Sequence, residues 1–364
     1  MSNSPARRRV RFPGISSRAW EHPAHRSALV ALRALPGFDT LLKTMDGLFR
    51  GRKQRLMFLA SAVRVGERQF PELDRLLTDA VLTLDAQERP ELYVLQSPEV
   101  NAVSIGMQQP FIVLTTGLLD LMEHEELRVV IGHELGHVLS GHAVYQTMLG
   151  HLLRVAGNFG WLPVGGWSLR ALIAALYEWS RKSELSGDRA GLLVSQDPHA
   201  SIRVMMKIAG GAGLAQMDTV AFMEQAAEYE STGDARDSLA KLMNVELQTH
   251  PFSVMRAGQI RSWVDHGEYK AILSGKYPLR VDDPQASVTD QVKAAARSYR
   301  DNLTTSKDPL TQKVVGATRN LGGAAQNAGQ NVASALATLW RQANQAGTDI
   351  DGSADEGPAG APRP

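Results

Sequence analysis

Apolar side chains recur every three or four positions over much of the chain, which is the spacing of one face of an α-helix. Residues 56–84 follow this spacing, with breaks near Gly66 and Pro71. The strongest helical stretches run from after Gly117 through residue 149, and from about residue 169 to residue 194. We expect further helices around residues 29–41 and after positions 198, 220 and 237.

Three short runs between the helical regions predict β-strands instead. They cover residues 91–96, 102–105 and 111–115, and Pro98, Gly106 and Pro110 lie between them. We expect a small antiparallel sheet packed on the helix that follows it. The pattern as a whole therefore predicts a mainly helical α+β fold.

The composition changes after about residue 281. Residues 288–346 are rich in Ala, Gln, Asn and Thr, and the final stretch, TDIDGSADEGPAGAPRP, is typical of disorder. We expect three regions: a basic N-terminal arm with a short helix (1–50), a folded domain (51–281), and a weakly helical to disordered tail (282–364).

Charge and cysteine content narrow the function. Thirty-nine Lys and Arg residues against 38 Asp and Glu residues give a net charge of +1, which lacks the basic excess typical of nucleic-acid binding. The chain of 364 residues has no cysteine, so disulfides and thiolate metal sites are excluded. Histidine, aspartate and glutamate are left as the strong metal ligands.

No membrane-spanning segment is expected. The arginine-containing N-terminus is not followed by the apolar stretch of a signal peptide. The best spanning candidate, Val155 to Leu169, is shorter than the roughly 20 apolar residues that a helix needs to cross a bilayer, and glycines and a proline interrupt it. We therefore expect a cytoplasmic protein.

The motif with the clearest chemistry is His133-Glu134-Leu135-Gly136-His137, an H-E-x-x-H sequence inside a predicted helix. Positions i and i+4 share one helix face, so His133 and His137 can converge on one metal ion while Glu134 handles a proton. Gly132 and Gly136 weaken the helix, which indicates that another backbone approaches closely there.

A catalytic zinc site also needs a third protein ligand. The next strongly predicted helix offers Glu184 and Asp188, again at i and i+4. Glu184 can reach the metal, and Asp188 can accept a hydrogen bond from the second nitrogen of a ligand histidine. His142 lies about 140° around the helix from His137, so we expect it to support or pack against the site rather than to bind the ion.

Residues 90–265 resemble the gluzincin metallopeptidases grouped with the protease HtpX and the CAAX prenyl endopeptidases, metallopeptidase family forty-eight. The resemblance rests on four ordered segments: Asn101-Ala102 with Gly106, FIVLTTGLLDLM followed by ELRVVIGHELGHVLSGH, Glu184 to Asp188, and THPFSVMR with His250, Pro251 and Arg256. Two departures are Gly187, where the family has alanine, and the lack of the transmembrane helices of its membrane members.

The resemblance implies a gluzincin fold in which residues 51–281 form the catalytic domain. His133, His137 and Glu184 would bind one Zn²⁺ per chain, and Glu134 would be the general base that takes a proton from a water on the zinc. His250 would be a catalytic donor to the oxyanion, and Asn101 and Ala102 would lie beside the substrate. The implied activity is zinc-dependent endopeptidase hydrolysis of extended or unfolded polypeptides, which would pair with strand 102–105 or 111–115.

Two other functions stay open. One is a non-proteolytic binding or scaffold protein that keeps a zinc-stabilised peptidase fold, although a purely structural site has no need of Glu134. The other is a quality-control protease held peripherally at a membrane by the tail, through apolar residues such as Leu336 and Trp340. The physiological substrate, the oligomeric state and the regulation do not follow from the sequence.

Overall fold

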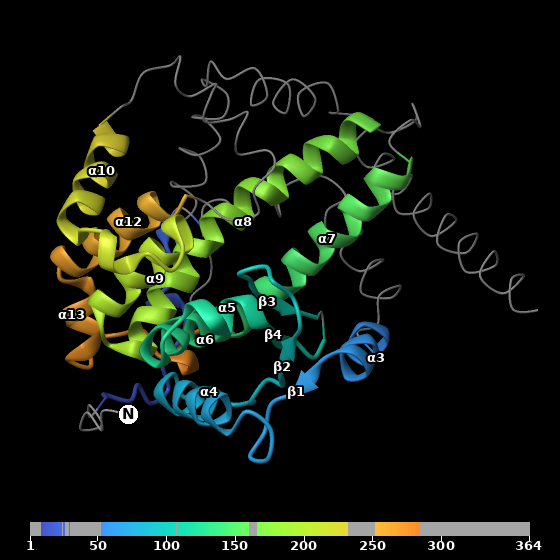
Figure 1. Cartoon of the computed structure of the whole chain (residues 1–364), viewed down its shortest axis with the longest axis horizontal. Coiled ribbons are helices and arrows are strands. Elements are labelled where there is room, and N and C mark those ends of the chain that lie inside the picture. Colours follow the sequence, from blue (N-terminus) through green and yellow to red (C-terminus); the bar gives the residue numbers. More distant parts are fainter. Residues whose placement is uncertain are drawn as a thin grey trace, which may run out of the picture.

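The computed structural model describes residues 9–23, 52–106, 108–159, 166–231 and 252–283, together with His25 and Leu29. In these ranges helices surround a small sheet (Figure 1). The longer helices are α3 (Arg52–Ser61), α4 (Pro71–Thr83), α6 (His124–Leu139), α7 (His142–Phe159), α8 (Gly166–Ser195), α9 (Pro198–Gly210), α10 (Thr219–Ser231) and α12 (Ser253–Asp265). Shorter elements are α5 (Thr116–Leu121), α13 (Glu268–Leu273), η1 (Ser17–Ala19), η2 (Leu214–Gln216) and η3 (Arg280–Asp282).

The sheet has the strand order β1-β2-β4-β3 in the described part of the chain. Its strands are β1 (Val63–Arg64), β2 (Leu92–Leu95), β3 (Ala102–Ile105) and β4 (Phe111–Thr115). Strands β1 and β2, and strands β3 and β4, pair antiparallel, whereas β2 and β4 run parallel. The expected mainly helical α+β fold is confirmed, but the sheet is mixed rather than wholly antiparallel.

The parallel pairing arises from the path of the chain between strands. Strand β3 does not form a hairpin with β2. It pairs on the outer side of β4, so β4 occupies the place next to β2. All five residues of β4 are buried, as expected for a central strand that is covered on both faces.

Helices α6 and α8 pack closely against each other. A Cβ atom at Gly132 would lie 2.6 Å from Cβ of Val194, and one at Gly136 would lie 2.3 Å from Cβ of Ala190. The expectation that these two glycines allow a close backbone approach is therefore confirmed. The main core includes Ile131 and Leu135 on α6, together with Leu192 on α8.

The N-terminal segment, residues 9–23, runs across the body rather than away from it. The Phe12 N–H donates a hydrogen bond to the Thr83 carbonyl oxygen, and the Ser16 N–H donates one to the Pro278 carbonyl oxygen. Phe12, Ile15 and Trp20 are buried in the main core. An antiparallel bridge joins Ile15 to Leu279, so this segment lies beside the last described residues.

Most expected elements are present in the described ranges. Helices α4, α8 and α9, and strands β3 and β4, lie where the pattern predicts them, and β1 is an additional strand. The expected helix around residues 29–41 is described only at Leu29. The helix expected after position 237 and the tail beyond residue 283 lie outside the described residues, so the three-region division stays a prediction. No helix in the described ranges is long and apolar enough to cross a membrane.

Candidate metal centre

Helix α6 carries the first three residues of the centre. Its N-terminus is closed by a reciprocal pair of hydrogen bonds, in which the Glu123 side chain accepts from the Glu126 backbone and the Glu126 side chain accepts from the Glu123 backbone. One turn separates His133 from His137, and both side chains are buried against α8. The helix thus presents two imidazoles to one point of its neighbour.

Helix α8 supplies a carboxylate at that point. The Nε2 atoms of His133 and His137 lie 3.0 Å apart. Glu184 places one carboxylate oxygen 3.4 Å from Nε2 of His133 and the other 3.3 Å from Nε2 of His137. The three groups are buried, and their potential ligand atoms all lie within 4.8 Å of one another.

These three residues fit a divalent metal ion. Two imidazole nitrogens and one carboxylate oxygen are the donor set of a catalytic zinc site, which leaves a fourth position open. Burial alone would lower the pKa of His133, but its hydrogen bonds with Asp188 and Glu184 outweigh burial and raise that pKa to about 10. The carboxylates therefore stabilise positive charge at the point where the ligand atoms converge.

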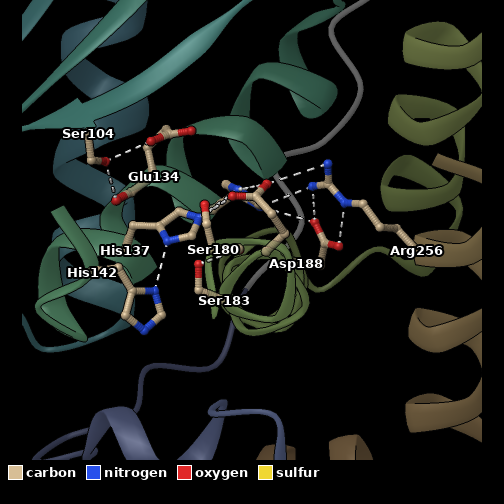
Figure 2. Close-up of polar contacts among 10 residues, drawn as sticks. Ser104, Glu134, His137, His142, Ser180, Ser183, Asp188 and Arg256 are labelled. Atoms are coloured by element: carbon tan, nitrogen blue, oxygen red, sulfur yellow. Dashed lines mark hydrogen bonds and ion pairs between the residues drawn. The ribbon is translucent and has the colours of Figure 1, made fainter. Parts of the chain in front are cut away.

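Asp188 holds His133 from behind. Its Oδ1 accepts a hydrogen bond from Nδ1 of His133 over 3.0 Å, and its Oδ2 accepts one from Nε of Arg256 over 2.8 Å. Burial by itself raises the pKa of Asp188, but the Arg256 guanidinium overcomes this effect and the pKa lies below its ordinary value. Figure 2 shows Arg256 reaching Asp188 from a separate helix, which is α12.

Glu134 points towards the sheet rather than towards α8. The hydroxyl of Ser104 on β3 lies 2.7 Å from Oε2 of Glu134 and 2.9 Å from the Glu134 carbonyl oxygen (Figure 2). Both residues are buried, with 1% and 4% of their surface exposed. Because a hydroxyl has one hydrogen, Ser104 donates to one of these two oxygens at a time.

Close packing at Gly187 lets both imidazoles approach α8. A Cβ atom at this position would lie 2.7 Å from Cε1 of His133 and 2.8 Å from Nε2 of His137. Glycine in place of the alanine of the resembled family therefore gives the two rings room in this arrangement.

The structure brings together most of the residues that the sequence singled out. His133, His137 and Glu184 converge, Asp188 lies behind His133, and Glu134 lies beside them. Ala102 begins β3, the strand that contains Ser104, and Asn101 directly precedes it. His250 lies outside the described residues.

Two contributing residues were missed or given no role. Ser104 has no sequence signal beyond its place in a predicted strand. Arg256 was noted only as part of the THPFSVMR segment, and that motif was the signal that could have led to it.

A buried pair of histidines from H-E-x-x-H with a glutamate from a second helix is the ligand arrangement of metal-dependent peptidases. The model of peptidase family M48 matches residues 67–264. This chain therefore belongs to peptidase family M48, a family of metal-dependent peptidases.

Two relatives illustrate the similarity. The chain is 34% identical over 267 residues to the plastoglobule-localized metallopeptidase 48 of Arabidopsis thaliana, covering 72% of this chain and 77% of that protein. It is 26% identical over 179 residues to protease HtpX homolog 2 of Methanosarcina mazei, covering 43% of this chain and 60% of that protein. No solved structure matches the chain significantly.

Proposed function

We propose that this metallopeptidase is a zinc-dependent endopeptidase that cleaves extended or unfolded polypeptides. The observation that carries the proposal is the buried convergence of His133, His137 and Glu184 next to Glu134. A purely structural metal site does not need an additional buried carboxylate beside its ligands.

His133, His137 and Glu184 would hold the ion. When bound, Zn²⁺ polarises a carbonyl group and lowers the pKa of water. The two imidazoles and one carboxylate support zinc over hard ions such as Mg²⁺ and Ca²⁺, which prefer oxygen ligands.

Glu134 would be the general base. In this role its carboxylate accepts a proton from the attacking water and then returns it to the leaving amine. Ser104 supports the role because its hydroxyl lies 2.7 Å from Oε2 of Glu134 and fixes one carboxylate oxygen. His250 remains the proposed donor to the oxyanion.

The substrate would pair with the free edge of β3. Strand β4 is bonded to β2 on one side and to β3 on the other, so of the two strands expected to receive substrate only β3 has an edge available in the described sheet. Ser104 joins this strand to Glu134, Ala102 begins it, and Asn101 directly precedes it. Backbone pairing of this kind selects an extended chain with little dependence on its side chains.

Cleavage of a reduced and carboxymethylated protein tests the proposal. Glu134→Gln should keep its zinc and lose activity by about 10²-fold or more, because the water is no longer deprotonated. Glu224→Gln, an exposed site on α10, is the control and should match the wild type. A chelator should abolish cleavage, and Zn²⁺ should restore it better than Mg²⁺.

Mass spectrometry of the products decides the remaining points. Internal fragments support an endopeptidase, whereas removal of terminal residues alone overturns that part of the proposal. Equal cleavage by the wild type and Glu134→Gln rejects Glu134 as the base. A wild type that binds zinc but cleaves nothing favours the non-proteolytic binding protein.

A further inference from the structure

We propose that His142 is a positioning residue that fixes the orientation of His137. In this role Nδ1 of His142 accepts a hydrogen bond from Nδ1–H of His137. Nε2 of His137 is thereby kept turned towards Glu184 and His133. The inference rests on the proposed function, in which His137 is a metal ligand.

The turn between α6 and α7 places the two rings together. Helix α6 ends at Leu139, and Gly141 adopts the left-handed φ of +69° that reverses the chain. His142 then begins α7, with its ring centroid 5.0 Å from that of His137. The Nδ1 atoms of the two rings lie 2.8 Å apart (Figure 2).

This distance requires one hydrogen between the two nitrogens. Nε2 of His137 lies 3.3 Å from Glu184 and 3.0 Å from Nε2 of His133, and it must be free of hydrogen to bind an ion. The hydrogen of His137 is then on Nδ1, and the atom within hydrogen-bond distance of it is Nδ1 of His142. His142 therefore acts as the acceptor and carries its own hydrogen on Nε2.

A neutral acceptor suits the charge of this site. Glu134, Glu184 and Asp188 supply three buried negative charges, and Arg256 together with a divalent ion supplies three positive ones. A carboxylate behind His137, matching Asp188 behind His133, would add a buried charge without a counterion. Imidazole provides the hydrogen-bond acceptor without that charge.

The surroundings hold His142 in one orientation. The residue is 1% exposed. Its ring meets the Trp179 ring of α8 edge to face, with the centroids 5.6 Å apart and the planes at 89°. On another side the centroid of the His25 ring lies 4.3 Å away. Because the rings of His137 on α6, Trp179 on α8 and His25 all contact this ring, its acceptor atom has little freedom to move.

Zinc affinity of four variants tests the role. The dissociation constant of Zn²⁺ is measured by competition with a chromogenic chelator, and the visible spectrum of the Co²⁺-loaded protein reports the geometry of the ligands. His142→Leu removes the acceptor and should raise the dissociation constant about 10–100-fold. His142→Asn places an amide oxygen near the position of Nδ1 and should stay within about threefold of the wild type. His199→Leu, an exposed site on α9, is the control and should leave both measurements unchanged.

Each outcome separates positioning from packing. Equal zinc affinity of folded His142→Leu and the wild type overturns the proposal, as does an Asn variant that is as weak as the Leu variant. Where His142→Leu does not fold, His142→Gln replaces it, because its amide oxygen reaches the position of Nε2 instead of Nδ1. Wild-type affinity of that variant also overturns the proposal. His137→Ala is the fourth variant, and if it binds zinc like the wild type, the proposed metal ligand has failed rather than the role of His142.

Discussion

The guanidinium of Arg256 forms two hydrogen bonds with the carboxylate of Asp188, at a place where both side chains are buried. The same carboxylate accepts a hydrogen bond from His133. Arg256 on α12 thus stabilises the negative charge of Asp188, and Asp188 in turn orients His133, a proposed metal ligand on α6. The centre depends on three helices, although its proposed ligands come from two.

Replacing Arg256 by methionine should destabilise the protein by about 3–5 kcal/mol, because the buried charge of Asp188 would lose its cationic partner. Urea unfolding measures the change. Arg261→Met, on the same helix, is the control, since its partner Asp265 is exposed and such pairs contribute about 1 kcal/mol or less. Similar losses for the two variants would argue against a special role of the Arg256 pair.

Replacing Ser104 by alanine should lower kcat about 10-fold while zinc content and KM stay near their wild-type values. The reason is that Glu134 would lose a hydrogen bond to its charged carboxylate, an interaction of about 1.5–3 kcal/mol. Steady-state kinetics with metal analysis checks the expectation, and exposed Ser61→Ala serves as the control. An unchanged kcat would show that Ser104 does not help to position the base.

Replacing Gly136 by alanine should destabilise the protein by about 1–2 kcal/mol. Alanine favours a helix over glycine by roughly 1 kcal/mol. At position 136, however, its Cβ would lie 2.3 Å from the Cβ of Ala190, so the contact between α6 and α8 would be overpacked. Gly150→Ala on α7 is the matched control, because no atom lies within 4 Å of its new Cβ. That variant should be as stable as the wild type or more stable. Thermal and urea unfolding of the pair would refute the packing argument if both variants gained stability.

Replacing Glu184 by alanine should lower the zinc content of the purified protein to a small fraction of one ion per chain. The two histidines alone leave the ion with too few protein ligands. Elemental analysis after dialysis measures the content, with Glu224→Ala on α10 as the control. Full retention of zinc would remove Glu184 from the ligand set.

Acid should weaken the protein through His22. Burial, followed by the nearby charge of Arg189, lowers the pKa of His22 from 6.5 to about 4. Between these pH values the unfolded chain binds a proton that the folded chain excludes, so the contribution to stability is complete above about pH 6.5 and is lost as the pH falls towards 4.

The size of this effect is up to about 3 kcal/mol. It is measured as the difference in unfolding free energy between the wild type and His22→Gln across that pH range. The advantage of the wild type over the variant should become smaller as the pH is lowered from about 6.5 to about 4, because the variant lacks the titrating imidazole. A constant difference would contradict the assigned pKa shift of His22.

The sequence pattern predicted those features that depend on residues close together along the chain, such as the extent of helices and strands and which side chains share a helix face. The i and i+4 positions of His133 and His137, and of Glu184 and Asp188, determined which side chains share a helix face, and α8 brings the two pairs together. Strands β3 and β4 have the predicted bounds because proline and glycine terminate them clearly. Helical periodicity predicted α8 to within a few residues of its ends.

Choices among partners distant in the sequence were not predictable in this way. The pairing of β2 with β4 depends on where β3 lies in three dimensions, and a strand as short as β1 cannot display an alternating pattern. Ser104 and Arg256 act through contacts across 30 and 68 positions, and neither residue has a periodic signature. Composition gave no information on these contacts.

The bridge between Ile15 and Leu279 also sets an order for biosynthesis. A ribosome releases the N-terminal segment first, but its partner in that bridge emerges only after every described residue of the metal centre. Domains complete their folding when such distant contacts form, and closing long loops delays them. The segment whose His22 N–H donates to the Ser186 hydroxyl on α8 therefore meets its bridge partner late, and a nascent chain carries the three proposed metal ligands before this bridge can form.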